Sequence, residues 1–275
     1  MTNIFDKVIS NDDDVKKFVE MFKDYKPYCI EQSTKVSKTS LMPNRIAIGF
    51  NKKSMTKQEV IAMAKALGIP DIHQATYFYN QYDTCSSIGF GLEKNESNSN
   101  YRMYFEKELS DLQKDELKAK HIREVPTIEG LKWYSDQATS HFDTTIYYSQ
   151  LYNETQEDRD NLINKAKFSF IPKIFSLDKT PDIMTNYFAV TRGLVERNAF
   201  YIRMDCPISE LTNDILTFTE CDLKQELQAF ADANVNMSAI SGSSYSHNRE
   251  SESLTIYFIH HDNNPTPPNV PTPSP

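Results

Sequence analysis

The stretch SIGFGLEKNESNSNYRMYFEK, residues 87–107, holds the pattern that decides the fold of this chain. Residues 87–94 and 101–107 are rich in apolar side chains, and residues 95–100 between them are only Asn, Ser and Glu. Two strand-like runs joined by a short polar turn predict an antiparallel hairpin. In the second run Arg102 and Tyr104 lie two positions apart, so they share one face of the expected strand.

A similar tripeptide returns three more times, each time within a strand-like run. Each copy places an aromatic residue two positions from a basic, small or polar one: Arg102-Met103-Tyr104, Thr145-Ile146-Tyr147, Tyr201-Ile202-Arg203 and Thr255-Ile256-Tyr257. The intervals are similar but unequal, which indicates repeated structural units rather than a solenoid of fixed repeat length. We therefore expect a sheet that carries tyrosines and cations on one face.

Further strand pairs and helices extend this pattern in both directions. The paired runs that follow are 131–136 with 144–151, 186–191 with 199–205, and 237–241 with 254–260. A charged stretch over residues 109–122 predicts a helical connection. Upstream, we expect a helix over 12–30 capped by Asp12–Asp14, a strand over 45–50, a helix opened by the Thr56–Glu59 capping box, and an extended segment over 75–82.

These elements predict an α+β fold in which antiparallel hairpins alternate with helices. Helices between hairpins must cover one face of the sheet, and the other face then needs its own partner. A closed antiparallel ten-stranded β-barrel surrounded by helices, built from repeated αββα units, meets this need and removes the sheet edges. We expect a single domain over residues 1–262 and a disordered Pro-rich tail over residues 263–275.

The composition argues against several classes of function. The net charge is −8 and the pI about 5.3, whereas nucleic-acid binding needs a basic field. The chain has only 7 glycines and no Gly-rich phosphate loop, which argues against a dinucleotide fold. The four cysteines are far apart, and we find neither a secretory leader nor an apolar run of membrane-spanning length. We expect a cytoplasmic monomer with free thiols and no membrane contact.

The shared strand face suggests a chemistry if it points into a closed barrel. Arg102, Lys132 and Arg203 would then provide cations that suit a diphosphate. The tyrosines on the same face are Tyr104, Tyr134, Tyr147, Tyr201 and Tyr257, and tyrosine rings suit a delocalised carbocation. Both groups together fit the ionisation of an allylic diphosphate. Glu106 and Asp205 continue this face and could act as a base, or serve as salt-bridge partners at the rim.

Two other interpretations stay open at this point. The protein could be a non-enzymatic, small-molecule-binding α+β protein with an aromatic-lined cavity. The strands could also form an open sheet of a structural or interaction protein, in which case Arg102, Lys132 and Arg203 would face solvent. A metal site is not evident, because no cluster of carboxylates stands at ligand spacing, although Mg²⁺ could assist by neutralising a diphosphate.

Residues 86–261 resemble the soluble aromatic prenyltransferases of the ABBA type, which include indole, phenol and cyanobactin peptide prenyltransferases. The resemblance lies in AFYIRMDCPISELTNDILTFTECDLKQELQAFADANV, in SLTIYFIHHD and in the earlier SIGFGLEK…NYRMYFEKE. It implies transfer of a prenyl group from dimethylallyl or geranyl diphosphate to an electron-rich aromatic acceptor, namely an indole, a phenol or a Tyr or Trp side chain.

The resemblance also implies roles for individual residues. Basic strand residues would hold the diphosphate: Arg45, Arg102, Lys132 and Arg203. Strand tyrosines would shield the allylic cation: Tyr104, Tyr147, Tyr201 and Tyr257. Many members carry a glutamate early in the barrel that activates the acceptor. The strand expected to correspond, residues 45–50, has none, and Glu31 is the nearest glutamate upstream.

Overall fold

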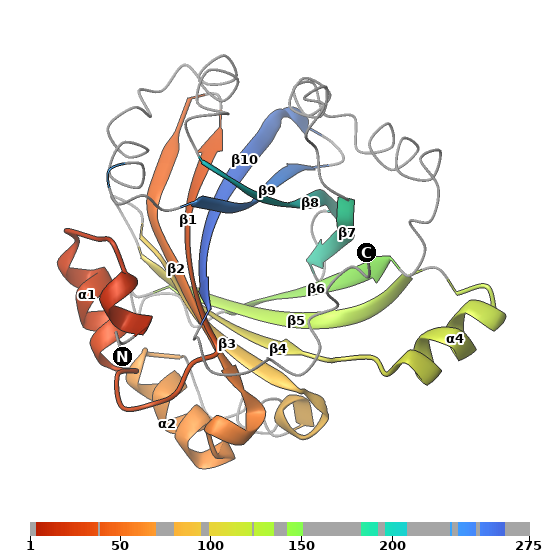
Figure 1. Ribbon diagram of the computed structural model, residues 1–275, viewed down its shortest axis with the longest axis horizontal. Helices are drawn as coiled ribbons and strands as arrows, with labels where there is room; N and C mark the ends of the chain where they lie inside the picture. Colours follow the sequence, from red (N-terminus) through yellow and green to blue (C-terminus); the bar gives the residue numbers. More distant parts are fainter. Residues whose placement is uncertain are drawn as a thin grey trace.

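The computed structural model of the chain describes residues 4–37, 39–69, 80–94, 99–122, 124–134, 142–150, 183–191, 196–207, 232, 236–245 and 248–261. Within these ranges a long antiparallel sheet curls around a central axis, with helices on its outside (Figure 1). The mixed α and antiparallel-β class predicted from the sequence is confirmed. The predicted tail, residues 263–275, lies outside the described residues.

Ten strands of the described chain form this sheet. They are β1 (Cys29–Ser37), β2 (Leu41–Asn51), β3 (Ser87–Glu93), β4 (Asn100–Glu106), β5 (Glu124–Tyr134), β6 (Phe142–Gln150), β7 (Ile183–Thr191), β8 (Glu196–Pro207), β9 (Asn236–Tyr245) and β10 (Asn248–His261). Each strand pairs antiparallel with its neighbour in sequence, and β1 also pairs with β10, so that the hydrogen-bonded order returns on itself. The predicted hairpin over residues 87–107 is β3 and β4, paired from Ser87 with Glu106 to Glu93 with Asn100.

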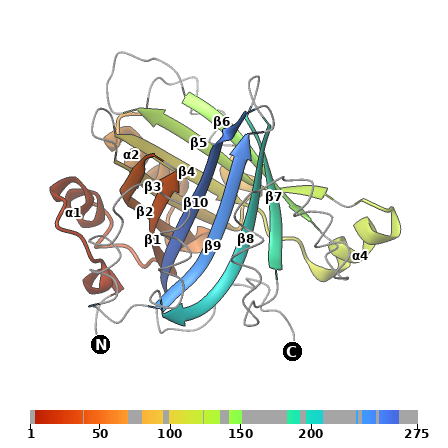
Figure 2. The ribbon, with the colours of Figure 1, turned by 90° about the horizontal axis from the view of Figure 1, so that it is seen from above.

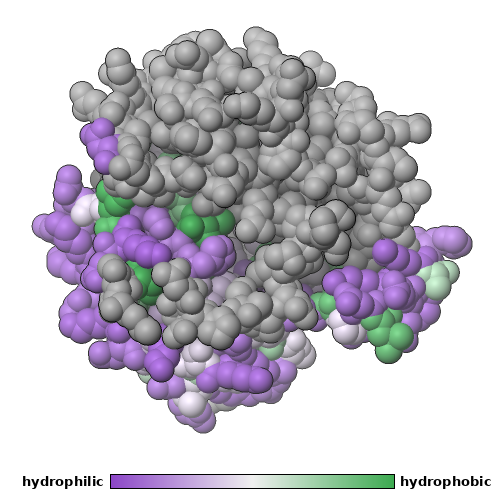
Figure 3. Space-filling model, in the orientation of Figure 1, coloured by the Kyte–Doolittle hydropathy of each residue, from purple (hydrophilic) through white to green (hydrophobic). Residues whose placement is uncertain are grey.

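Three α-helices and two 3-10 turns with described bounds accompany the strands. They are α1 (Asp13–Glu20), α2 (Lys57–Ala66), α4 (Asp111–Ala119), η1 (Ile4–Lys7) and η2 (Lys52–Ser54). Figure 2 shows α1 and α4 on opposite sides of the strands. The exposed surface over α1, α2 and α4 is mostly hydrophilic in the view of Figure 3, and α4 has no buried residue. No helix in the described part of the chain is long and apolar enough to cross a membrane.

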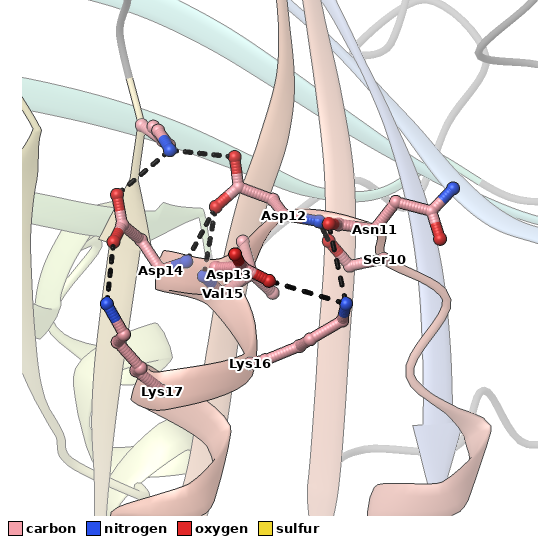
Figure 4. Close-up of polar contacts among 9 residues, drawn as sticks. Ser10, Asn11, Asp12, Asp13, Asp14, Val15, Lys16 and Lys17 are labelled. Carbon is pink, nitrogen blue, oxygen red and sulfur yellow. Dashed lines mark hydrogen bonds and ion pairs between the residues drawn. The ribbon is translucent and has the colours of Figure 1, made fainter.

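The N-terminus of α1 is fixed by the acidic run predicted to cap it. The side chain of Asp12 accepts hydrogen bonds from the backbone N–H groups of Asp14 and Val15, at 2.9 and 3.2 Å (Figure 4). Lys94, at the end of β3, lies 2.9 Å from carboxylate oxygens of both Asp12 and Asp14. The cap therefore satisfies free N–H groups of the first turn and also ties the helix to the sheet.

The hydrophobic core lies between the outer face of β2–β5 and helices α1 and α2. Alternate strand residues point outward and are buried, because successive side chains of a strand face opposite sides. Phe22, just after α1, packs against Phe50 and Phe90, with ring centroids 5.5 and 5.0 Å apart. The buried Trp133 of β5 donates a hydrogen bond of 2.9 Å to the carbonyl of Leu67, just after α2. The apolar residues thus anchor the helices and leave the inner face to polar side chains.

Three expectations at the N-terminal side were wrong. The helix predicted over 12–30 ends at Glu20, and residues 29–37 form β1, which the pattern did not indicate. The reason is that β1 carries Glu31, Ser33 and Lys35 on its inner face and buried polar residues on its outer face, so it lacks the usual hydrophobic alternation. Residues 80–84, partly assigned to an extended segment, are helical.

Candidate active site on the inner face of the sheet

A small cavity opens on the inner face of β1–β4. Its polar lining consists of Glu31, Ser33, Arg45, Glu93, Arg102 and Tyr104. Strand register places these residues together. One row of residues, each paired with the next on the neighbouring strand, crosses five strands and consists of Tyr257, Ser33, Arg45, Glu93 and Asn100. The space exists because the adjacent row carries Ala47 and Gly91 between Glu31 and Arg102, and these two small residues leave the wall recessed.

Two arginines share one carboxylate in this cavity. Glu93 Oε2 lies 2.9 Å from Arg45 Nε and 2.5 Å from a terminal guanidinium nitrogen of Arg102. The side chains are largely enclosed, at 15% exposure for Arg45, 17% for Arg102 and 7% for Glu93. Asn100 accepts a hydrogen bond of 3.3 Å from Arg102 Nε. Arg45 Nη1 is buried and has no hydrogen-bond partner within the described structure.

The charge state of Glu93 follows from this arrangement. Burial by itself would raise the pKa of the Glu93 carboxyl, but Arg102 and Arg45, with Lys35 and Lys132 further off, hold it well below its usual range. Glu93 is therefore an anion under all ordinary conditions, and it neutralises part of the charge of the surrounding cations.

Tyr104 lies beside the arginine pair and next to a second tyrosine. Its ring centroid is 6.3 Å from that of Tyr147, with the ring planes at 59°. Burial raises the pKa of Tyr104 to about 12, against the opposing effect of Arg102. Its backbone neighbours across the sheet are Gly89 and Gly130, where an added Cβ would come within 3.2 and 3.3 Å of the Tyr104 ring. The two glycines thus provide the room in which this ring lies against the inner wall.

The other predicted residues include Lys132 and Tyr257, whose side chains the structure describes, and Tyr201 and Arg203 on β8. Lys132 is paired with Arg102, and its ammonium lies 4.7 Å from the centroid of the Tyr134 ring. Tyr257 is paired with Ser33, on the same row as Arg45. Tyr201 and Arg203 lie on β8, paired with Ser241 and Ala239, and their side chains are outside what the structure describes. Ala239 of β9 is also paired with Tyr257 of β10.

Glu31 is, like Glu93, a residue of this cavity that the sequence did not assign to the site. It lies on the first strand, paired with Ala47 and Ile259, and lines the cavity with Arg45 and Tyr104. Burial raises the pKa of its carboxyl to about 7, although Arg45 opposes this effect. No alternation could have revealed it, because all five residues of 31–35 (EQSTK) are polar.

A second polar cluster lies at the opposite end of β3. Glu106 accepts hydrogen bonds from Ser87 Oγ at 2.8 Å and from Tyr28 Oη at 3.5 Å. Burial raises the pKa of the Glu106 carboxyl, and the two hydrogen bonds oppose this rise. Glu106 therefore continues the inner face as predicted, with Ser87 and Tyr28 as its hydrogen-bond partners. Cys29 and Cys85 are free thiols, and within the described residues no group of three His, Cys, Asp or Glu side chains could hold a metal ion.

Comparison with known proteins identifies the architecture. No protein-family model matches the sequence, and no curated protein sequence is detectably similar to it. Among solved structures, AnaPT from Neosartorya fischeri aligns with a TM-score of 0.54 and 9% sequence identity, over 84% of this chain and 78% of AnaPT. The NotF prenyltransferase aligns with a TM-score of 0.52 and 11% identity, over 84% of this chain and 80% of NotF. The chain has the fold of the aromatic prenyltransferases.

The prenyltransferase fold confirms the architectural part of the resemblance noted from the sequence. At this level of identity the likeness extends to the fold and not to individual residues. The chemistry of the cavity therefore has to be argued from its own side chains.

Proposed function

We propose that the protein is an aromatic prenyltransferase, in which the ten strands close into a barrel that encloses the reaction. The transferred group would come from dimethylallyl or geranyl diphosphate, and the acceptor would be an electron-rich ring such as an indole, a phenol or a Tyr or Trp side chain. The observation that carries the proposal is the pair Arg45 and Arg102 beside Tyr104, on the inner face of a sheet with this fold.

The arginine pair supplies the diphosphate site in this proposal. Arg45 has a buried guanidinium nitrogen without a partner, and Arg102 lies across the same cavity. Guanidinium groups bind phosphate oxygens through paired N–H donors, and they strengthen that interaction as charge develops on the leaving diphosphate. Lys132 and Arg203 complete the set of cations proposed for this site.

The tyrosines are proposed to stabilise the allylic cation. When the C–O bond to the diphosphate breaks, the bonding electrons leave with the diphosphate and an allylic cation remains. The faces of Tyr104 and Tyr147 are suited to stabilise that cation through their ring quadrupoles and to exclude water from it. Tyr201 and Tyr257 are proposed for the same role on the strands across the barrel.

Glu31 is the proposed base. After a ring carbon of the acceptor attacks the allylic cation, the new C–C bond leaves a positively charged ring that must lose one proton. The Glu31 carboxylate lines the same cavity, and a pKa of about 7 suits a group that accepts a proton near neutral pH. This role places the acceptor between Glu31 and Tyr104.

The direct test is a product assay with purified protein. Incubation with dimethylallyl or geranyl diphosphate and a panel of indoles, phenols and Tyr- or Trp-containing peptides should give an acceptor heavier by one prenyl group in mass spectrometry. Arg102→Ala should raise the KM for the diphosphate by roughly tenfold or more, because a charged hydrogen-bond partner is lost. Glu31→Gln should lower kcat by about 10²-fold or more with little change in that KM.

A variant outside the sheet is the control, and a protein that neither reacts nor binds would contradict the proposal. Lys114→Ala removes a cation from α4, outside the sheet, and should change neither constant. If the folded protein yields no product with any pair and binds neither diphosphate, it is not a prenyltransferase, and a non-enzymatic binding role takes its place.

A further inference from the structure

Glu93 lies where a bound anion would be expected. Its carboxylate accepts from Arg45 Nε and from the terminal nitrogen of Arg102, and its pKa is held down by these two and by Lys35 and Lys132. It belongs to the wall itself, at the end of β3, with its backbone paired to Arg45 on one side and Asn100 on the other.

A carboxylate and a phosphate group make the same demand on arginine. Both present two or more oxygens to the N–H groups of one guanidinium, so they compete for the same donors. Two enclosed arginines without a counter-charge would destabilise the fold. Glu93 supplies that counter-charge when the cavity holds no ligand. An incoming diphosphate can bind the unpartnered Arg45 Nη1, but it then shares the charge of both arginines with Glu93 and competes for the donors that Glu93 holds.

We propose that Glu93 competes with the diphosphate group for Arg45 and Arg102 and keeps the affinity for free inorganic diphosphate low. This inference rests on the proposed function and deepens it. A prenyl diphosphate gains further contacts from its apolar chain along Tyr104 and Tyr147, whereas inorganic diphosphate has none. Glu93 therefore weakens the binding of both ligands, and the contacts of the prenyl chain alone restore affinity, so that the released inorganic diphosphate is held weakly.

The test is the affinity for inorganic diphosphate, measured by titration calorimetry on the full chain. Glu93→Gln keeps the shape of the side chain and removes its charge, so Kd for inorganic diphosphate should fall by roughly tenfold or more. The matched control is Glu106→Gln on the same inner face, whose carboxylate is bonded to Ser87 and Tyr28. This control should leave Kd within about twofold of the wild type.

A second measurement distinguishes competition from a general effect on folding. Glu93→Gln should lower the Tm of the free protein, and saturating inorganic diphosphate should raise it by more than in the wild type, because the ligand replaces the missing counter-charge. If Glu93→Gln does not fold, Glu93→Asp withdraws the carboxylate from both arginines and should tighten binding in the same direction.

The outcomes separate this inference from the proposed function. If the wild type binds dimethylallyl diphosphate while Glu93→Gln binds inorganic diphosphate equally or more weakly, Glu93 orients the arginines and does not compete with the ligand. The inference then fails alone. If neither the wild type nor the variants bind any diphosphate, the diphosphate site and the inference fail together.

Discussion

At the scale of single residues, the inner face of the sheet shifts the pKa values of its carboxyl groups in opposite directions. Glu31 and Glu93 lie on the same cavity, yet burial dominates at Glu31 and raises its pKa to about 7, while two arginines dominate at Glu93 and lower its pKa. One carboxyl is therefore able to exchange a proton near neutrality and the other is a fixed anion.

The titration of Glu31 has a measurable effect on stability. Its pKa in the folded protein, about 7, lies above its ordinary value of 4.5, so the folded state holds the proton more tightly than the unfolded state. The stabilisation is complete below pH 4.5 and is lost as the pH rises through 7. Between pH 5 and pH 8 the free energy of unfolding of the wild type should fall relative to Glu31→Gln by up to about 3 kcal/mol.

Urea unfolding of both proteins at pH 5, 6, 7 and 8 checks this expectation. Glu116→Gln on α4, an exposed glutamate, is the control and should give a curve parallel to that of the wild type. If the Glu31→Gln curve is also parallel to that of the wild type, folding does not raise the pKa of Glu31. Its assignment as a base then loses its support.

Part of this residue-level arrangement could be read from the sequence. The alternation of strand side chains places Arg102 and Tyr104 on one face, and the structure brings them together on the cavity wall. Register, which no single strand reveals, brings Arg45 to the same wall and places Lys132 beside Arg102 on the next strand. Glu31 and Glu93 were not identified as site residues, because their importance depends on neighbours from other strands.

At the scale of elements, the two strands of the hairpin over residues 87–107 were easier to predict than the N-terminal strands. The runs over 87–107 alternate clearly and became β3 and β4 within a residue at each end. The acidic run and the Thr56–Glu59 capping box located the starts of α1 and α2 for a local physical reason, since each cap bonds to N–H groups within three residues. β1 escaped prediction because its outer face is partly polar and its inner face lines the cavity.

Helix α2 is held to the sheet by a contact that local sequence does not encode. The N–H of Trp133 reaches the carbonyl of Leu67, one of the carbonyl groups left free where the helix ends. Trp133→Phe should lower the free energy of unfolding by about 1 to 3 kcal/mol, because the buried carbonyl loses its donor and the core loses volume.

Urea unfolding followed by circular dichroism measures this change, since Trp133 is the only tryptophan and the variant has no tryptophan fluorescence to follow. The control is Tyr101→Phe, whose ring lies 6.1 Å from that of Trp133 and which leaves the Leu67 carbonyl bonded. It should cost less than about 0.5 kcal/mol. Equal losses in the two variants would show that the Trp133 hydrogen bond does not stabilise the helix.

At the scale of the whole molecule, the first and last strands of the described chain are neighbours. Cys29 of β1 is paired with His261 of β10, and the pairing continues to Ser37 with Ser253. This contact brings Tyr257 onto the row of Ser33 and Arg45, so the proposed site draws on both ends of the sheet. The repeated tripeptides indicated units of one sheet, but only the long-range pairing shows which units meet.

The central claim is that the cavity between Glu31, Arg45 and Arg102 binds the allylic diphosphate. The most direct measurement is a crystal structure of the full chain with dimethylallyl thiolodiphosphate, an analogue that ionises slowly. The account predicts diphosphate oxygens within hydrogen-bond distance of Arg45 Nη1 and Arg102, and the prenyl chain against Tyr104. An analogue bound elsewhere, or a cavity that stays empty at saturating analogue with the Arg45–Glu93–Arg102 contacts intact, would contradict it.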